Sequence, residues 1–151
     1  MVSLADVRRI LGGSDHRQQA CEQGLNTALR SLVPIEHELR EIESQEESLR
    51  RLLATHGAEN QSLSHAELLI LLRRQAVIRR QIANLGLDHA RVTAECEGIT
   101  QDVKRLRETR KVLQKKHLKY QHLEQRLVRE NSARVWRREE NDIEELLVNS
   151  K

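Results

Sequence analysis

The sequence predicts an all-α protein, a long two-helix antiparallel coiled-coil hairpin that forms one elongated domain over residues 1–151. Three observations predict it. Charged residues make up 32% of the chain, Gly and Pro together contribute only seven residues, and Phe is absent beside a single Trp and a single Tyr. A compact core normally needs large aromatic side chains and frequent turn residues, whereas this composition is typical of helices that bury a narrow seam.

The first helix is expected over about residues 3–54, because apolar residues recur there in alternating steps of three and four. Twelve of the fifteen positions are apolar when Cys21 is counted. Pro34 lacks a backbone N–H and clashes with the preceding turn, so we expect a kink or a short break between Ser31 and Pro34. The fifteen positions of this first seam are Leu4, Val7, Leu11, Ser14, Gln18, Cys21, Leu25, Ala28, Leu32, Ile35, Leu39, Ile42, Glu46, Leu49 and Leu53.

A turn is expected over about residues 55–63, followed by a second helix over about residues 64–147. Gly57 and Asn60 favour the turn, and Ser64 precedes Glu67 by three residues, which is the spacing of a helix-initiating capping box. Eleven of fourteen positions of the second seam are apolar. They are Leu68, Leu71, Gln75, Ile78, Ile82, Leu85, His89, Val92, Cys96, Ile99, Val103, Leu106, Arg110 and Leu113.

The two seams can face each other in more than one register. The register in which facing residue numbers add to 117 gives a tight turn and pairs Cys21 with Cys96; a one-heptad slip to 124 stays open. Under the first register Leu113 faces Leu4, so the last thirty or so residues of the second helix should have no partner. The two cysteines form no disulfide framework, which indicates a reducing, cytoplasmic compartment.

Several classes of protein are not supported. No apolar run approaches the roughly 20 residues needed to cross a bilayer, and the first thirteen residues lack the apolar core of a signal peptide. His117 and His122 are five residues apart and diverge on a helix, and the metal-binding and phosphate-binding motifs are missing. A two-helix coiled coil also offers no dry cleft, so we expect no enzyme, no metal and no cofactor.

Two features could bind partners. Thirteen basic residues lie between Lys104 and Arg138, opposed only by three glutamates, which indicates either a solvated face or a surface for an acidic partner. Near the turn, Leu69, Ile70 and Val77 point away from the seam, and this indicates either a contact site or a wider core built by a third helix or by self-association. Nucleic acid is not favoured, because aromatic residues for base stacking are missing.

The segment from Gly57 to Ile82 resembles the central stalk protein of type III secretion systems, the SctO family of InvI, SpaM and YscO type, which is related to flagellar FliJ. The resemblance rests on Ala58-Glu-Asn, Leu63-Ser, the Leu-Leu-Arg-Arg-Gln stretch at 71–75 and the Ile-Arg-Arg-Gln-Ile stretch at 78–82. Length, the opening Ser3-Leu4 and the charged second helix agree with it. The chain departs from the family in having almost no aromatic residues, which puts an aromatic contact to the export gate in doubt.

The resemblance implies a non-enzymatic stalk at the cytoplasmic face of the inner membrane that links the hexameric secretion ATPase to the export gate. It further implies binding of secretion chaperones, without nucleic acid binding or membrane insertion. We name the implied gate contact the tip set: Leu52, Leu69, Ile70, Arg73, Arg74, Val77 and Arg80. We name the implied ATPase contact the basic set: Lys115, Lys116, Lys119, Arg126, Arg129, Arg134 and Arg137. The alternative is a coiled-coil secretion chaperone or escort adaptor that binds export substrates.

Overall fold

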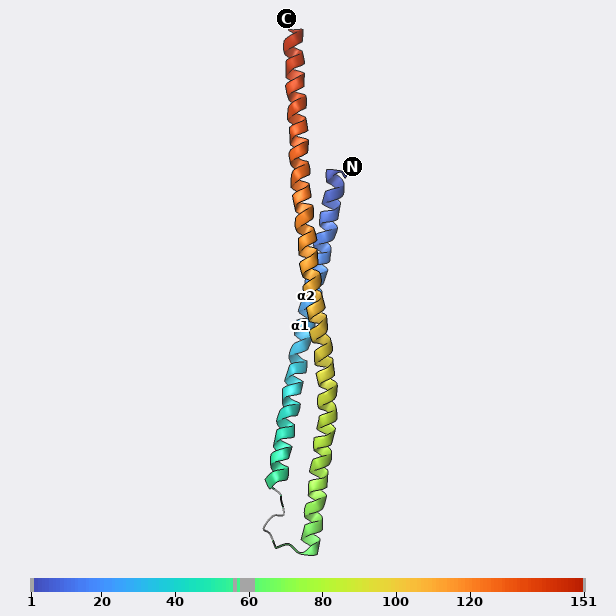
Figure 1. Cartoon of the computed structure of the whole chain (residues 1–151), viewed down its shortest axis with the longest axis vertical. Coiled ribbons are helices and arrows are strands. Elements are labelled where there is room, and N and C mark those ends of the chain that lie inside the picture. Colours follow the sequence, from blue (N-terminus) through green and yellow to red (C-terminus); the bar gives the residue numbers. More distant parts are fainter. Residues whose placement is uncertain (1, 56, 58–61, 151) are drawn as a thin grey trace. The chain divides into compact units, whose positions relative to one another are not determined.

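The computed structural model describes residues 2–55, 57 and 62–150, and this part of the chain contains two α-helices and no β-strand. Helix α1 spans Leu4–Thr55 and helix α2 spans His65–Asn149 (Figure 1). The predicted all-α two-helix hairpin is confirmed. Residues 56 and 58–61, which belong to the expected turn, lie outside the described residues.

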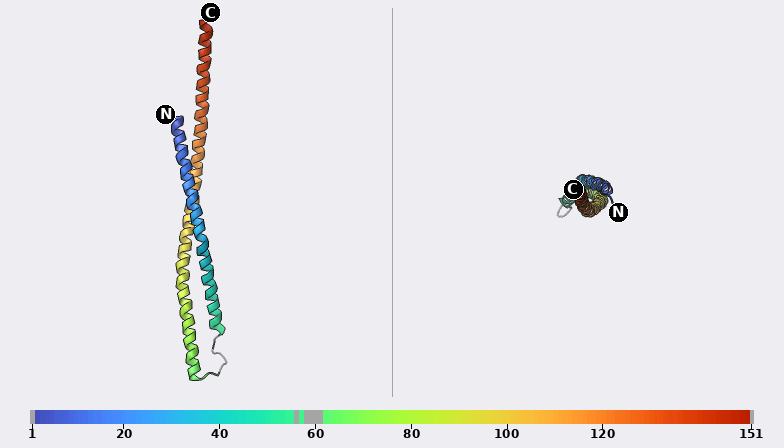
Figure 2. Two further views of the ribbon diagram at one scale, coloured as in Figure 1. Left: turned by 180° about the vertical axis from the view of Figure 1, so that it is seen from behind. Right: turned by 90° about the horizontal axis from the view of Figure 1, so that it is seen from above.

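The chain forms two compact units, which are described separately. Unit 1 comprises Met1–Leu25 and Arg105–Lys151, and unit 2 comprises Asn26–Lys104. In each unit the two helices run antiparallel (Figure 2). The expectation of one domain over the whole chain stays a prediction.

Both helices begin with a capping box. The Ser64 backbone N–H donates to Glu67 Oε2 over 3.1 Å, and the Glu67 N–H donates to Ser64 Oγ over 3.3 Å, as predicted. The same motif opens α1, where the Ser3 N–H donates to Asp6 Oδ2 over 3.2 Å and the Asp6 N–H donates to Ser3 Oγ over 3.1 Å. This second box was not predicted, although the sequence shows its Ser-x-x-Asp spacing.

Helix α1 continues through Pro34 without a break. The carbonyl of Arg30 accepts no helix hydrogen bond from position 34, because proline has no backbone N–H. Pro34 is exposed, so water can hydrate this carbonyl instead. The short break that we expected is absent from the described helix, and the kink stays a prediction.

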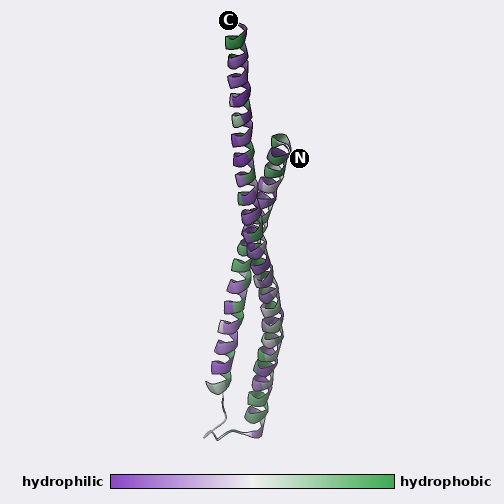
Figure 3. Ribbon diagram, turned by 45° about the horizontal axis from the view of Figure 1, so that its top comes forward, coloured by the Kyte–Doolittle hydropathy of each residue, from purple (hydrophilic) through white to green (hydrophobic). Residues whose placement is uncertain are grey.

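Hydrophobic residues recur along both helices among hydrophilic ones (Figure 3), and the apolar residues at the predicted seam positions are the ones that are buried or half-buried, except Leu68. Every position of the first seam is buried or half-buried, and so is every position of the second except Leu68, which is 37% exposed. The most deeply buried side chains are Val7 in unit 1 and Val92 in unit 2. The seam of α2 also continues past Leu113, because Leu127 is still half-buried.

The register differs from both alternatives that we considered. In unit 1, Ser14 lies against His117 and Arg8 against Glu124; in unit 2, Glu43 lies against His89. The residue numbers of these pairs add to about 131, so the registers of 117 and 124 are wrong. A pairing of Cys21 with Cys96 is therefore wrong as well.

The cause of the error is the heptad itself. A slip of two heptads keeps every apolar seam position on the seam, so apolar spacing alone cannot distinguish 117 from 131. Polar neighbours do distinguish them. The observed register brings Glu22 within 3.4 Å of Arg110 in unit 1, and it brings Glu38 within 3.5 Å of Arg91 in unit 2.

Three helical glycines are not required by packing. A Cβ atom added at Gly12, Gly86 or Gly98 would meet nothing within 4 Å. Glycine in a helix interior costs about 0.5–1 kcal/mol relative to alanine, so each of these positions lowers the stability of its helix without a steric reason.

Candidate functional site

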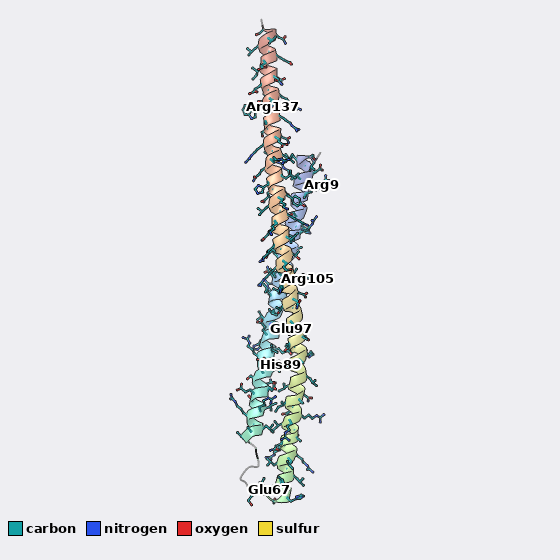
Figure 4. The ribbon with its side chains drawn as sticks, in the orientation of Figure 1. Arg9, Glu67, His89, Glu97, Arg105 and Arg137 are labelled. Carbon is teal, nitrogen blue, oxygen red and sulfur yellow. The ribbon has the colours of Figure 1, made fainter. Side chains whose placement is uncertain are left out.

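In unit 2, the start of α2 has little of α1 to pack on. In the observed register Leu53 faces Ile78 and Thr55, the last residue of α1, faces Ala76, so residues 65–75 extend past the end of α1. Figure 4 shows Glu67 at this end of α2. The register thus explains why large apolar side chains are exposed there: Leu68, Leu69, Ile70 and Leu72. Leu52 and Val77 are exposed as well, because they lie off the seam positions.

Five members of the tip set line one open groove in unit 2. They are Leu52 from α1 with Ile70, Arg73, Arg74 and Val77 from α2, and the buried seam residue Ile78 completes the groove. The groove has a volume of about 650 Å³. Leu69 and Arg80 are exposed but do not line it. The structure therefore brings together most of the tip set.

The charged residues that α2 contributes around this groove are all positive. From Leu68 to Leu87 the chain contains four arginines and no acidic residue. On α1, by contrast, Arg50 and Arg51 are each paired with a glutamate four residues earlier. Within the described residues no acidic group pairs with Arg73 or Arg74. The groove thus offers an apolar floor and two guanidinium groups for a carboxylate-bearing partner.

In unit 1, four members of the basic set share one face of α2. Lys115, Lys119, Arg126 and Arg129 follow one another at helical spacing and are exposed, on the side of α2 away from its seam positions. Among the described residues, the only ion pair that involves these four joins Arg126 Nε to Glu130 Oε1 over 3.5 Å. This face of α2 therefore carries several cations that no carboxylate neutralises.

The remaining basic-set residues lie elsewhere on α2. By helical spacing Lys116 lies beside the four-residue face. Arg137 lies further along α2, in the segment past the last half-buried position (Figure 4). Arg134 lines a hollow of about 480 Å³ with Val2 and Leu4 at the start of α1. The basic set is therefore not a single patch.

Several polar seam positions have polar partners. The Ser14 hydroxyl lies 3.1 Å from His117 Nδ1, and His117 Nε2 lies 3.1 Å from Gln121 Nε2. His89 Nε2 lies 3.2 Å from Glu43 Oε1.

Across the described residues, no group of three His, Cys, Asp or Glu side chains is placed to hold a metal ion. No described helix is apolar over a sufficient length to span a bilayer.

The C-terminal part of α2 has no partner from α1. Every described residue from Val128 onward is exposed, whereas Leu123, Glu124 and Leu127 are half-buried. The unpartnered segment therefore begins about two heptads later than the predicted position after Leu113, as the corrected register requires. Its exposed large apolar residues are Val128, Val135, Trp136, Ile143, Leu146, Leu147 and Val148.

Comparison with known proteins gives one match. A family model described as "Salmonella surface presentation of antigen gene type M protein" matches residues 5–147, which include most of both units. No curated protein matches the chain, and no solved structure matches it.

Proposed function

The chain belongs to the family of the Salmonella surface presentation of antigen gene type M protein, a family associated with type III secretion, and from this membership we propose that it is the central stalk of an injectisome. The stalk links the hexameric secretion ATPase to the export gate of the inner membrane and so supports secretion of effectors and translocators. It acts without catalysis, at the cytoplasmic face of the inner membrane.

The groove of unit 2 is the observation that carries the proposal. Five of the seven tip-set residues line it, and they combine an apolar floor with unneutralised arginines. Apolar grooves of this kind bind amphipathic helices through apolar anchors, with charge fixing the orientation. We therefore assign the export-gate contact to this groove.

The ATPase contact is assigned to the basic face of unit 1. Lys115, Lys119, Arg126 and Arg129 present positive charge along several turns of α2. An acidic lining of the ATPase pore would be attracted to this face, and the attraction would weaken as salt screens it. Export chaperones are further proposed partners, without assigned residues.

The first experiment separates a stalk from the alternative, a chaperone or adaptor. The full chain is purified together with the cognate ATPase, and the copies per hexamer are counted by native mass spectrometry. One copy per hexamer supports the stalk. Stoichiometric binding of an export substrate without any ATPase binding would instead establish the chaperone function and overturn the proposal.

The second experiment tests the groove. Ile70→Asp and Val77→Asp should abolish secretion, because a carboxylate would be placed in the apolar floor, while helicity by circular dichroism stays unchanged. Leu87→Asp is the matched control, since Leu87 is 72% exposed on α2 and does not line the groove. Normal secretion by the groove variants would show that the groove is not the gate contact.

The third experiment tests the basic face. Reversing Lys119, Arg126 and Arg129 to Glu should weaken ATPase binding and reduce its salt dependence. Reversing Arg30, Arg40 and Arg79 changes the net charge equally and should leave binding intact. Equal effects of the two triple variants would mean that only net charge matters, which contradicts a specific contact.

A further inference from the structure

The seam of α2 continues past the end of α1 in unit 2. Leu68 and Leu71 occupy seam positions, but in the observed register no residue of α1 lies opposite them, because α1 ends at Thr55. Leu68 is 37% exposed and Leu71 is half-buried. Helix α2 therefore carries seam residues that α1 would reach only by sliding toward the start of α2.

A slide of one heptad costs little apolar burial. We name the register in which facing residue numbers add to 124 the slipped register; the described structure has the other one. Of the fifteen facing pairs of seam residues, nine join two apolar residues in either register, when cysteine and Tyr120 are counted as apolar. Leu53, for example, lies opposite Ile78 in the observed register and opposite Leu71 in the slipped one. Apolar packing therefore does not separate the two registers.

Acidic residues of α1 recur one heptad apart beside the seam. In unit 1, Arg110 Nη1 lies 3.4 Å from Glu22 Oε1, and Asp15 precedes Glu22 by seven residues. A slide of one heptad would exchange Glu22 for Asp15 beside Arg110. Asp15 is exposed and forms no ion pair within the described part of the chain. The slipped register would thus remake this pair.

Unit 2 repeats the same spacing. His89 Nε2 on α2 (Figure 4) lies 3.2 Å from Glu43 Oε1, and Glu36 precedes Glu43 by seven residues. The slide would exchange Glu43 for Glu36 beside His89. Three other pairs across the seam have no such replacement, so the observed register is the more populated one: Arg8 with Glu124, Ser14 with His117, and Glu38 with Arg91.

The connection between the helices favours a slide in one direction. Nine residues join Thr55 to His65. In the observed register α2 begins about 17 Å along the axis beyond the end of α1, and in the slipped register it would begin about 6 Å beyond. An equal slide the other way would need about 27 Å, close to the full reach of nine extended residues. It would also bring Asp15 toward Glu124, which have like charge.

We propose that α1 slides along α2 between the observed and the slipped register, by about 10 Å, and that this slide links the exposure of the two ends of the seam. In unit 2 the slipped register covers Leu71 with Leu53. It also moves Leu52 from Val77 to Ile70 and so changes the shape of the groove that these three residues line.

The opposite change occurs in unit 1. Leu4 moves from Leu127 to Tyr120, so Leu123 and Leu127, which are half-buried in the observed register, lose their cover. Helix α1 is uninterrupted from Leu4 to Thr55, so the slide at one end accompanies the slide at the other. A molecule that binds at either end and prefers one register therefore changes the other end, whichever molecules these are.

Disulfide trapping measures both registers. In a chain whose two native cysteines are replaced by serine, Leu39→Cys is combined with Val92→Cys (the observed pair), with Leu85→Cys (the slipped pair) or with Ile99→Cys (an equal slide the other way). Under mild oxidation the observed pair should crosslink fastest within one chain. The slipped pair should crosslink more slowly but to completion, and the third pair should stay reduced. A slipped pair that stays reduced, or that crosslinks no faster than the third pair, overturns the proposal.

Charge variants test the remade pairs. Asp15→Asn with Glu36→Gln removes acids that pair only in the slipped register, so crosslinking of the slipped pair should slow by about 2- to 30-fold, the range for two exposed ion pairs. Glu22→Gln with Glu43→Gln is the matched opposite change and should accelerate it by a similar factor. Rates that neither change affects contradict the exchange of partners.

Hydrogen exchange tests the link between the ends. The chain locked by the slipped-pair disulfide is compared with the chain locked by the observed-pair disulfide. The first should exchange more slowly over residues 69–75 and faster over residues 121–127, because α1 then covers the former and leaves the latter. Equal exchange of the two locked chains at both ends would mean that the slipped-pair disulfide forms by local distortion, and it overturns the proposal.

Discussion

Ser14 and His117 meet across the seam of unit 1, where the Ser14 hydroxyl lies 3.1 Å from His117 Nδ1. Ser14 is only 3% exposed, so this is a buried polar pair within an apolar seam. A slip of one heptad would separate the two groups and leave the hydroxyl without this partner. Buried polar pairs of this kind fix register in coiled coils at some cost in stability.

The first prediction concerns this pair. Replacing both residues by leucine, Ser14→Leu with His117→Leu, should raise the free energy of unfolding, because each buried leucine contributes about 1.5–3 kcal/mol. Chemical denaturation followed by circular dichroism measures it. His117→Leu alone should gain less, since it leaves the Ser14 hydroxyl facing an apolar side chain. A double variant that is less stable than the unaltered chain would contradict this account.

The second prediction concerns the register in unit 2. In a chain with Cys21→Ser and Cys96→Ser, Leu39→Cys with Val92→Cys should form a disulfide within one chain under mild oxidation. The reason is that positions 39 and 92 face each other in the observed register. In this register Arg91 Nη2 lies 3.5 Å from Glu38 Oε1, and Arg91 and Glu38 immediately precede the two positions. Leu39→Cys with Ile78→Cys is the matched pair for the register of 117. Efficient crosslinking of that second pair would refute the observed register.

The third prediction concerns Pro34. Pro34→Ala should raise the free energy of unfolding by about 2 kcal/mol, because alanine restores an N–H to an uninterrupted helix and removes a steric clash. The value allows for the greater freedom that alanine gives the unfolded chain. Thermal or denaturant unfolding measures the change, with Val33→Ala as the control at the neighbouring exposed position. Unchanged or lower stability would mean that the helix needs proline at this point.

The fourth prediction concerns the start of α1 and its pH dependence. Hydrogen bonds from the Ser3 hydroxyl and then from the Ser3 backbone N–H hold the pKa of Asp6 below its ordinary value of 3.8. A lowered pKa in the folded state means that the carboxylate stabilises the helix start above 3.8 and that this contribution is lost as pH falls through the folded pKa. Asp6→Asn should therefore increase amide hydrogen exchange in the first turn at neutral pH.

The same comparison at low pH supplies the control. Below the lowered pKa that Asp6 has in the folded state, its carboxyl is protonated in the unaltered chain as well, so both proteins should exchange at similar rates. Exchange at the first turn of α2 should be equal in the two proteins at every pH, because Ser64 and Glu67 are untouched. A difference between the proteins that persists at the lowest pH would exclude the carboxylate as its cause.

The seam could be predicted from the sequence because it depends on one property that the sequence displays directly, the spacing of apolar residues. Val7, Ile42 and Val92 lie on the predicted seam and are buried. The register could not be predicted in the same way, since a two-heptad slip leaves these residues on the seam. It depends on flanking pairs such as Glu22 with Arg110, which become informative only when both helices are aligned together.

The tip set was likewise predicted only in part. Composition and spacing identified Ile70 and Val77 as apolar residues that point away from the seam, and the structure places both in one groove. The absence of an α1 partner for residues 65–75 was not predicted, because it follows from the position of the end of α1 at Thr55 relative to Ile78. The apolar residues beyond Val128 were also missed, since they leave the seam positions and follow another face of α2.

The glycines at 12, 86 and 98 have a mechanical consequence. Each weakens its helix at a point where a methyl group would fit, so neither packing nor backbone geometry explains the cost. Locally weaker turns let a helix bend under load without unpacking its seam. Gly→Ala at all three positions should therefore make both helices stiffer against bending.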